Sequence, residues 1–100
     1  GLITLPRASH SENEEQLYLL WGANTEDNFS HYKLYRSVYP DFKADDETFI
    51  ADIFPEEFCV GRYIDTNLEK HTRYYYRVCA VNKDGVRGKL SDEFSAYTKE

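Results

Sequence analysis

The side chains that could do chemistry in this 100-residue chain are three histidines and a group of carboxylates. His10, His31 and His71 lie in three separate segments, so a metal site or a nucleophile–base pair would need distant segments to converge. We therefore interpret all three as ordinary surface residues. The carboxylates between Asp41 and Glu47, with Asp52 beyond them, lack the glycine and the ligand order of an EF-hand loop. A solvated acidic loop is the preferred interpretation over a calcium site.

The sequence carries no signature of an enzyme or of a bound cofactor. There is no serine nucleophile elbow, no paired-histidine zinc motif and no glycine-rich loop that could cradle a phosphate. The two cysteines, Cys59 and Cys79, are too few for a disulfide framework and lack the short paired spacing of a zinc site. No catalytic residue, no metal ligand and no cofactor is therefore predicted.

The composition describes one globular domain. With 41% hydrophobic residues the chain has enough apolar surface to offset its ordering entropy, and its length suits a single core. A net charge of −6 disfavours nucleic acid and anionic membranes as partners. Apolar runs such as Leu19 to Trp21 are too short to insert into a membrane, and the N-terminus does not resemble a signal peptide. The chain is therefore expected to be a fragment of a larger multidomain protein.

Alternation of apolar and polar residues with period two predicts β-strands along most of the chain. In residues 73–82 the even positions from Tyr74 to Ala80 are predicted to face the core, and residues 82–85 supply a turn. Its predicted strand partner is residues 94–98. Further strands are predicted over residues 16–22, 31–38, 48–54 and 60–66, with a short N-terminal piece over residues 2–5.

The same alternation assigns faces to the upstream strands. Leu17, Leu19 and Trp21 share one inward face, and Tyr32 and Leu34 share another. No window sustains the three-and-four spacing of an amphipathic helix. Short strands separated by Pro, Gly, Asn and Asp clusters indicate an all-β antiparallel sandwich.

The segment from Leu68 to Asn82, followed by Gly85, resembles the sixth strand of a fibronectin type III domain. In that family a leucine, a threonine and a tyrosine open the strand, which runs into Ala-Val-Asn and a glycine turn. Trp21 falls where the family places its second-strand tryptophan, and residues 91–98 resemble its last strand. The resemblance covers residues 15–98. It implies a seven-stranded antiparallel β-sandwich of immunoglobulin-like topology, formed by residues 1–100 as a single domain.

Two departures from the family pattern are visible. Lys70 stands where the family usually has proline, which makes the turn before Tyr74 less rigid. The acidic insertion between Asp41 and Glu47 widens the connection between the third and fourth strands. The resemblance also implies that Tyr74 is a tyrosine corner, whose hydroxyl bonds to backbone near Leu68. The expected structural core contains Trp21, Leu68, Tyr74, Tyr76 and Val78.

A candidate binding face follows from the family topology. It places Tyr35, Tyr75 and Tyr97 on three neighbouring strands, facing outward, with Lys33 and Arg77 beside them. Flat aromatic surface with polar donors suits stacking against sugar rings or packing against another domain. Cross-strand stabilisation of the sheet is the third interpretation, and the sequence leaves all three open. The same topology places Cys79 on the outer side and Cys59 in the opposite sheet, so they are expected to be unpaired.

The stretches HYKLYRSVYPDF and YIDTNLEKHTRYYYRV are similar to fibronectin type III modules appended to secreted bacterial glycoside hydrolases. This similarity implies a non-catalytic accessory module that spaces or docks the catalytic domain of a polysaccharide-degrading or cell-surface protein. The expected location is extracellular, at the cell surface or periplasmic. The implied partners are neighbouring domains of the same polypeptide, and a polysaccharide is a further candidate. The alternative is a carbohydrate- or protein-binding module that uses the tyrosine face.

Overall fold

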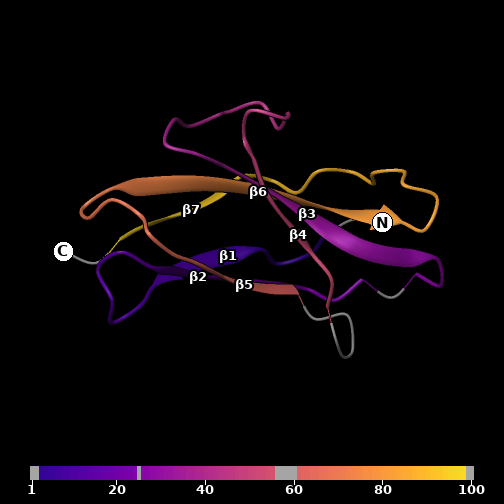
Figure 1. Ribbon diagram of the computed structural model, residues 1–100, viewed down its shortest axis with the longest axis horizontal. Helices are drawn as coiled ribbons and strands as arrows, with labels where there is room; N and C mark the ends of the chain where they lie inside the picture. Colours follow the sequence, from indigo (N-terminus) through magenta and orange to yellow (C-terminus); the bar gives the residue numbers. More distant parts are fainter. Residues whose placement is uncertain (1–2, 25, 56–60, 99–100) are drawn as a thin grey trace.

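The computed structural model describes residues 3–24, 26–55 and 61–98, and the regular structure in these ranges is all β-strand. No helix that could span a membrane occurs among these residues. Figure 1 shows most of the strands running roughly along the long axis of the molecule, while β4 crosses it steeply. The seven strands are β1 (Arg7–His10), β2 (Leu17–Trp21), β3 (Phe29–Ser37), β4 (Phe49–Ile53), β5 (Gly61–Asp65), β6 (Arg73–Asn82) and β7 (Phe94–Tyr97).

The strands form two stacked antiparallel sheets (Figure 1). One sheet has three strands in the order β1-β2-β5, and the other has four in the order β4-β3-β6-β7. The seven-stranded antiparallel sandwich predicted from the sequence is thereby confirmed. Apolar residues alternate with polar ones because each strand turns one face to the opposite sheet and the other away from it.

The core lies between the sheets and is built from the inward faces that the alternation predicts. In β2 the buried residues are Leu17, Leu19 and Trp21, and the two residues between them are exposed. The Trp21 ring meets the Tyr32 ring edge to face, with 5.3 Å between centroids. This geometry is favoured by the ring quadrupoles. The expected core residues Trp21, Leu68, Tyr74, Tyr76 and Val78 are all buried in this one cluster.

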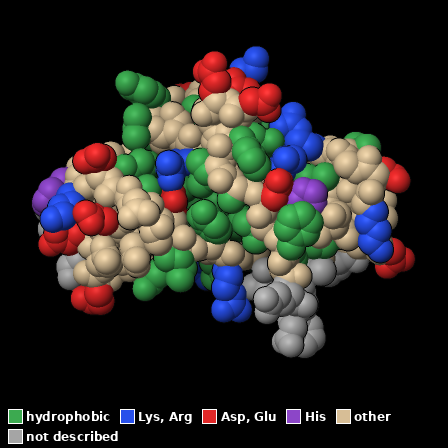
Figure 2. All heavy atoms as spheres, viewed as in Figure 1, with side chains coloured by type: hydrophobic (Ala, Val, Ile, Leu, Met, Phe, Trp, Pro, Cys, Tyr) green, Lys and Arg blue, Asp and Glu red, His purple; other side chains and the backbone are tan. Residues whose placement is uncertain are grey.

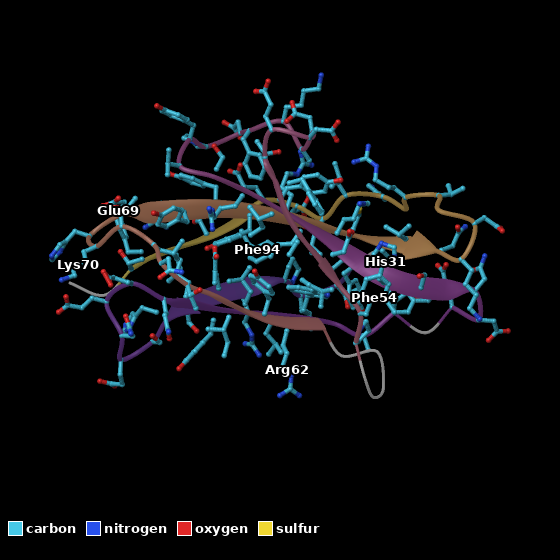
Figure 3. All side chains as sticks on the ribbon, in the orientation of Figure 1. His31, Phe54, Arg62, Glu69, Lys70 and Phe94 are labelled. Carbon is cyan, nitrogen blue, oxygen red and sulfur yellow. The ribbon has the colours of Figure 1, made fainter. Side chains whose placement is uncertain are left out.

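The predicted tyrosine corner is present. The backbone N–H of Glu69 donates a 2.8 Å hydrogen bond to the Tyr74 hydroxyl, one residue beyond Leu68. The Thr98 hydroxyl reinforces the same turn, because it donates to the Glu69 carbonyl at 2.9 Å and accepts from the Thr72 N–H at 3.0 Å. These bonds hold the turn before β6, at the left of Figure 3, without the proline that the family usually places at Lys70.

The prediction for the N-terminal strand was wrong. The first strand among the described residues is β1, after Pro6; residues 3–5 form no strand, and Leu2 lies outside the described residues. Ile3 is buried in the core and the Thr4 carbonyl accepts a 2.7 Å hydrogen bond from Gly22, but Leu5 has a φ of 51° that ends this extended stretch. Because β1 is mostly exposed and polar, hydrophobic alternation could not identify it. Its pairing with β2 defines it instead.

The pairing of β6 with β7 is confirmed, although the connection is wider than a tight hairpin. Gly85 takes a φ of 80° in the turn, and its N–H donates to the Asn82 carbonyl. The chain then follows β6 through backbone bonds from Gly88 and Ser91 before β7 begins. Tyr76 lies opposite Phe94 in the register. The Ser91 hydroxyl accepts from the Val78 N–H at 3.0 Å, which keeps this buried connection hydrogen-bonded.

Candidate functional site

The three tyrosines of the predicted binding face do lie on neighbouring strands. Tyr35 is on β3, Tyr75 on β6 and Tyr97 on β7, and these strands are adjacent in the four-stranded sheet. In the strand pairing Tyr35 lies opposite Arg77 of β6, and Tyr97 lies opposite Arg73 of β6. The tyrosines are therefore diagonal neighbours on the outer face of the sheet, as the period of two requires.

The prediction that Tyr35 is exposed was wrong. Its side chain points away from the main core, but it is only 3% exposed because the loop between β3 and β4 folds over it. Phe42 from that loop and Cys79 from β6 form a second buried cluster with Tyr35. The Tyr35 hydroxyl accepts a 2.6 Å hydrogen bond from Arg87 Nη1. Tyr35 therefore holds a loop in place and offers no surface to a ligand.

The acidic loop is accordingly more than a solvated segment. Asp41, Asp46 and Glu47 are exposed as predicted, whereas Phe42 is buried and Ala44 packs beside it. The described residues contain no group of three or more His, Cys, Asp or Glu side chains that could hold a metal ion. Burying Phe42 under an acidic loop secures the loop against the sheet.

Of the other two tyrosines of the predicted face, Tyr97 is exposed and Tyr75 is only partly exposed. Tyr75 is half-buried against the Tyr35 cluster, and Tyr97 is 53% exposed at the sheet edge formed by β7. The Arg73 guanidinium lies 4.1 Å from the Tyr97 ring centroid, so a cation covers one ring face. The aromatic surface that remains is smaller than the sequence predicted.

The predicted cationic partners make contacts within the chain. Lys33 Nζ lies 3.0 Å from Asp52 Oδ1 and 4.5 Å from the Phe49 ring centroid. Arg77 Nε donates a 3.2 Å hydrogen bond to the Ser91 carbonyl. Both side chains therefore stabilise the outer side of the sheet.

Cys79 lies on the outer side of its sheet, as predicted, but it is fully buried beneath the loop. Its thiol is free, and burial raises its pKa above the ordinary value, which keeps it protonated and unreactive. Cys59 lies outside the described residues, and so does the prediction about its pairing.

The histidines do not converge. His10 and His71 are exposed, in agreement with the prediction. His31 is partly buried, which was not predicted: its ring stacks on Phe54 at 4.5 Å, and its Nε2 lies 3.3 Å from Asp52 Oδ1. Figure 3 shows His31 and Phe54 side by side. These contacts assign His31 a packing role at the β3–β4 edge.

Sequence reasoning missed the outer face of the three-stranded sheet. Tyr18 and Leu20 from β2 and Ile64 from β5 are exposed there, beside Arg7 and Arg62. They line a shallow groove of about 630 Å³. The signal was present, because the β2 sequence Leu-Tyr-Leu-Leu-Trp is apolar on both of its faces and not only on the inward one.

Asp65 is the buried carboxylate that most resembles a catalytic group, but its partners give it a structural role. It is 3% exposed and accepts hydrogen bonds from Arg36 Nη1 at 2.8 and 2.9 Å, one to each oxygen. The Tyr76 hydroxyl donates a third hydrogen bond to the same carboxylate. This network lies between the sheets and lines none of the grooves described above.

Comparison with solved structures places the fold among known domains. An Fn3-like protein from Clostridium thermocellum is 27% identical, with a TM-score of 0.74, and the match covers 100% of this chain and 95% of that one. Chicken CNTN1 FN1–FN3 domains are 19% identical with a TM-score of 0.79, covering 100% of this chain and 32% of that chain. A β-1,2-glucanase from Parabacteroides distasonis is 22% identical with a TM-score of 0.70, covering 100% and 13%. No protein-family model and no curated protein matches the chain.

Proposed function

Because the chain has the fibronectin type III fold, we propose that it is a non-catalytic accessory module that spaces or docks a catalytic domain. The proposed parent is a secreted bacterial polysaccharide-degrading enzyme or a cell-surface protein, so the module would lie outside the cell or in the periplasm. The observation that carries this proposal is that a similar fold covers 13% of a β-1,2-glucanase chain. The greater part of that enzyme belongs to other structure.

The shape of the sandwich supports a spacing role. Its principal extents are 41 × 27 × 20 Å, and the described chain starts toward one end of the long axis and finishes at the other (Figure 1). Neighbouring domains attached at the two ends would be held apart by roughly the length of the sandwich. The buried network of Asp65 with Arg36 and Tyr76 ties the two sheets together and stiffens such a spacer.

The experiment for this proposal compares the isolated chain with the longer protein that contains it. The isolated chain should release no sugar from a panel of soluble polysaccharides, and it should bind none of them. Hydrogen exchange of the two forms then separates the roles, since docking would protect one outer face in the longer protein and spacing would not. Cleavage of any polysaccharide by the isolated chain would contradict the proposal.

A second candidate is a carbohydrate- or protein-binding module, and the exposure of Tyr97 beside Tyr75 favours it. If this face binds a polysaccharide, both Tyr75→Ala and Tyr97→Ala should abolish saturable binding, because each removes a stacking surface. Tyr39→Ala is the matched control, since Tyr39 is an exposed tyrosine on the β3–β4 loop and does not belong to the tyrosine face. Loss of binding in the control as well would contradict a site on the tyrosine face.

A further inference from the structure

The outer face of the three-stranded sheet carries an ordered set of side chains. In the pairing of β1, β2 and β5, Leu20 lies between Arg7 and Arg62. Tyr18, two residues before Leu20 on β2, lies between Ser9 and Ile64. Tyr18, Leu20 and Ile64 are large and exposed. We call the hollow that these side chains line the outer groove. It comprises Arg7, Ser9, Tyr18, Leu20, Arg62 and Ile64, with adjoining parts of Leu19 and Tyr63.

The outer groove is cationic in an acidic protein. The chain has a net charge of −6, yet the charged side chains that line the groove are both arginines and none is a carboxylate. Among the described residues neither Arg7 nor Arg62 makes an ion pair or a side-chain hydrogen bond. Arg7 on β1 and Arg62 on β5 are two strands apart, which puts their backbones at a separation of about 10 Å. The groove therefore suits an apolar projection that carries carboxylates.

The loop between β3 and β4 has the complementary character. Residues 38–47, which we call the acidic knob, expose two apolar side chains, Val38 at 48% and Tyr39 at 73%. The same segment holds four carboxylates against Lys43, a net charge of −3 by sequence. Figure 2 shows acidic side chains gathered at the top of the molecule, over this loop.

The acidic knob is held in its shape before any contact is made. The Phe42 side chain anchors the knob by packing against Tyr35 and Cys79. The Asp45 carboxylate accepts hydrogen bonds from the Glu47 and Thr48 N–H groups at 3.0 and 3.3 Å. The Tyr39 N–H donates to the Ser37 hydroxyl at 3.0 Å. A segment ordered in this way loses little conformational entropy when it docks.

The acidic knob and the outer groove lie on opposite faces of the sandwich. In Figure 1 the loop rises above the four-stranded sheet, and in Figure 3 Arg62 points away from the molecule on the other side. One copy therefore cannot place its acidic knob in its own outer groove. Two copies can do so, with each contributing a different face.

We propose that the acidic knob of one copy docks in the outer groove of a second copy. Val38 and Tyr39 cover Leu20 and Ile64, while carboxylates of the knob pair with Arg7 and Arg62. The contact is heterologous, so it leaves a free knob at one end and a free groove at the other, and it repeats. The inference goes beyond the proposed function and does not depend on it. Because the two patches are small, association is expected only at concentrations from about 0.1 to 1 mM.

The test is sedimentation velocity of the chain over this range, with one variant for each half of the contact. Arg62→Glu damages the groove and Tyr39→Ser damages the knob, and each alone should weaken association at least about tenfold. An equimolar mixture of the two variants should form 1:1 dimers that extend no further, because one intact groove and one intact knob remain. Lys83→Glu and Val86→Ser, exposed changes of the same kind on the β6–β7 turn, should associate like the parent chain.

Three results would overturn the proposal. The first is a parent chain that stays monomeric up to about 1 mM. The second is association that the Arg62→Glu and Tyr39→Ser variants retain, or that their mixture fails to restore. The third is a monomeric chain whose outer groove binds an anionic polysaccharide such as polygalacturonate in an Arg62-dependent way, since the occupant would then be a glycan. The circular dichroism spectrum and melting temperature of each variant establish that it is folded.

Discussion

Tyr76 donates a 2.7 Å hydrogen bond to Asp65 across the interior of the sandwich, and this contact joins β6 of one sheet to β5 of the other. Arg36 from β3 binds the same carboxylate. A buried charge is costly unless it is paired and hydrogen-bonded, and here one carboxylate has partners on two strands of the facing sheet. The network therefore links the two sheets through the interior of the sandwich.

Removing the charge of Asp65 should destabilise the fold. Asp65→Asn removes the charge that pairs with Arg36 Nη1 and leaves Tyr76 with a poorer acceptor, and we expect it to lower the free energy of unfolding by about 2–4 kcal/mol. Asp52→Asn is the matched control, because Asp52 pairs with Lys33 at the surface, and its cost should stay below about 1 kcal/mol. Urea denaturation measures both. Equal costs for the two variants would show that the buried network contributes no more stability than the surface pair.

Stability should fall at alkaline pH. Burial, followed by the Asp65 charge, raises the pKa of Tyr76 far above its ordinary value of 10.0, and burial raises the pKa of the Cys79 thiol above 9.0. Above these ordinary values the unfolded chain releases protons that the folded chain keeps, so the stabilisation is complete below pH 9 and is lost as the pH rises. Each group contributes a slope of about 1.4 kcal/mol per pH unit.

The Tyr76→Phe variant isolates the tyrosine contribution to this slope. It should be less stable than the parent chain at pH 7, because Asp65 loses a donor, but its stability should decline less steeply above pH 10. Urea denaturation at several pH values from 7 to about 11 gives both quantities. An unchanged slope in this variant would show that Tyr76 does not titrate differently in the folded and unfolded chains.

The tyrosine corner should contribute through its hydroxyl. Tyr74→Phe leaves the Glu69 N–H without its acceptor, and we expect a loss of about 1–3 kcal/mol. Tyr75→Phe is the neighbouring control: Tyr75 is half-buried on the outer face, and its hydroxyl is not part of the corner. Its effect should be below about 0.5 kcal/mol. A melting temperature of Tyr74→Phe equal to that of the parent chain would remove the argument for the corner.

Gly61 is predicted to tolerate no side chain. A β-carbon at this position would meet the indole of Trp21, which is itself buried in the core. Gly61→Ala should therefore cost about 1–3 kcal/mol and shift the tryptophan fluorescence, because the ring has to move. Gly85→Ala is the control, since that turn has open space around it and only the cost of its positive φ of 80° applies. Unaltered fluorescence in Gly61→Ala would contradict the close packing.

Much of the fold was predictable from local patterns. The resemblance of Leu68, Thr72 and Tyr74 to the family pattern implied the corner, and the alternation in β2 and β6 assigned every core residue named from those strands to the correct face. The N-terminal strand escaped prediction because Arg7–His10 is polar and exposed. Its strand character comes from hydrogen bonds to β2, which leave no hydrophobic pattern in the sequence.

The candidate site was less predictable, and Tyr35 shows why. Period-two alternation determines which side of a sheet a side chain faces, so the outward direction of Tyr35, Tyr75 and Tyr97 follows from the sequence alone. Alternation carries no information about what covers that side. Only the tertiary structure places Phe42 over Tyr35, joins Asp65 to Arg36 and sets the acidic knob opposite the outer groove, because these relationships depend on how segments distant in the chain pack together.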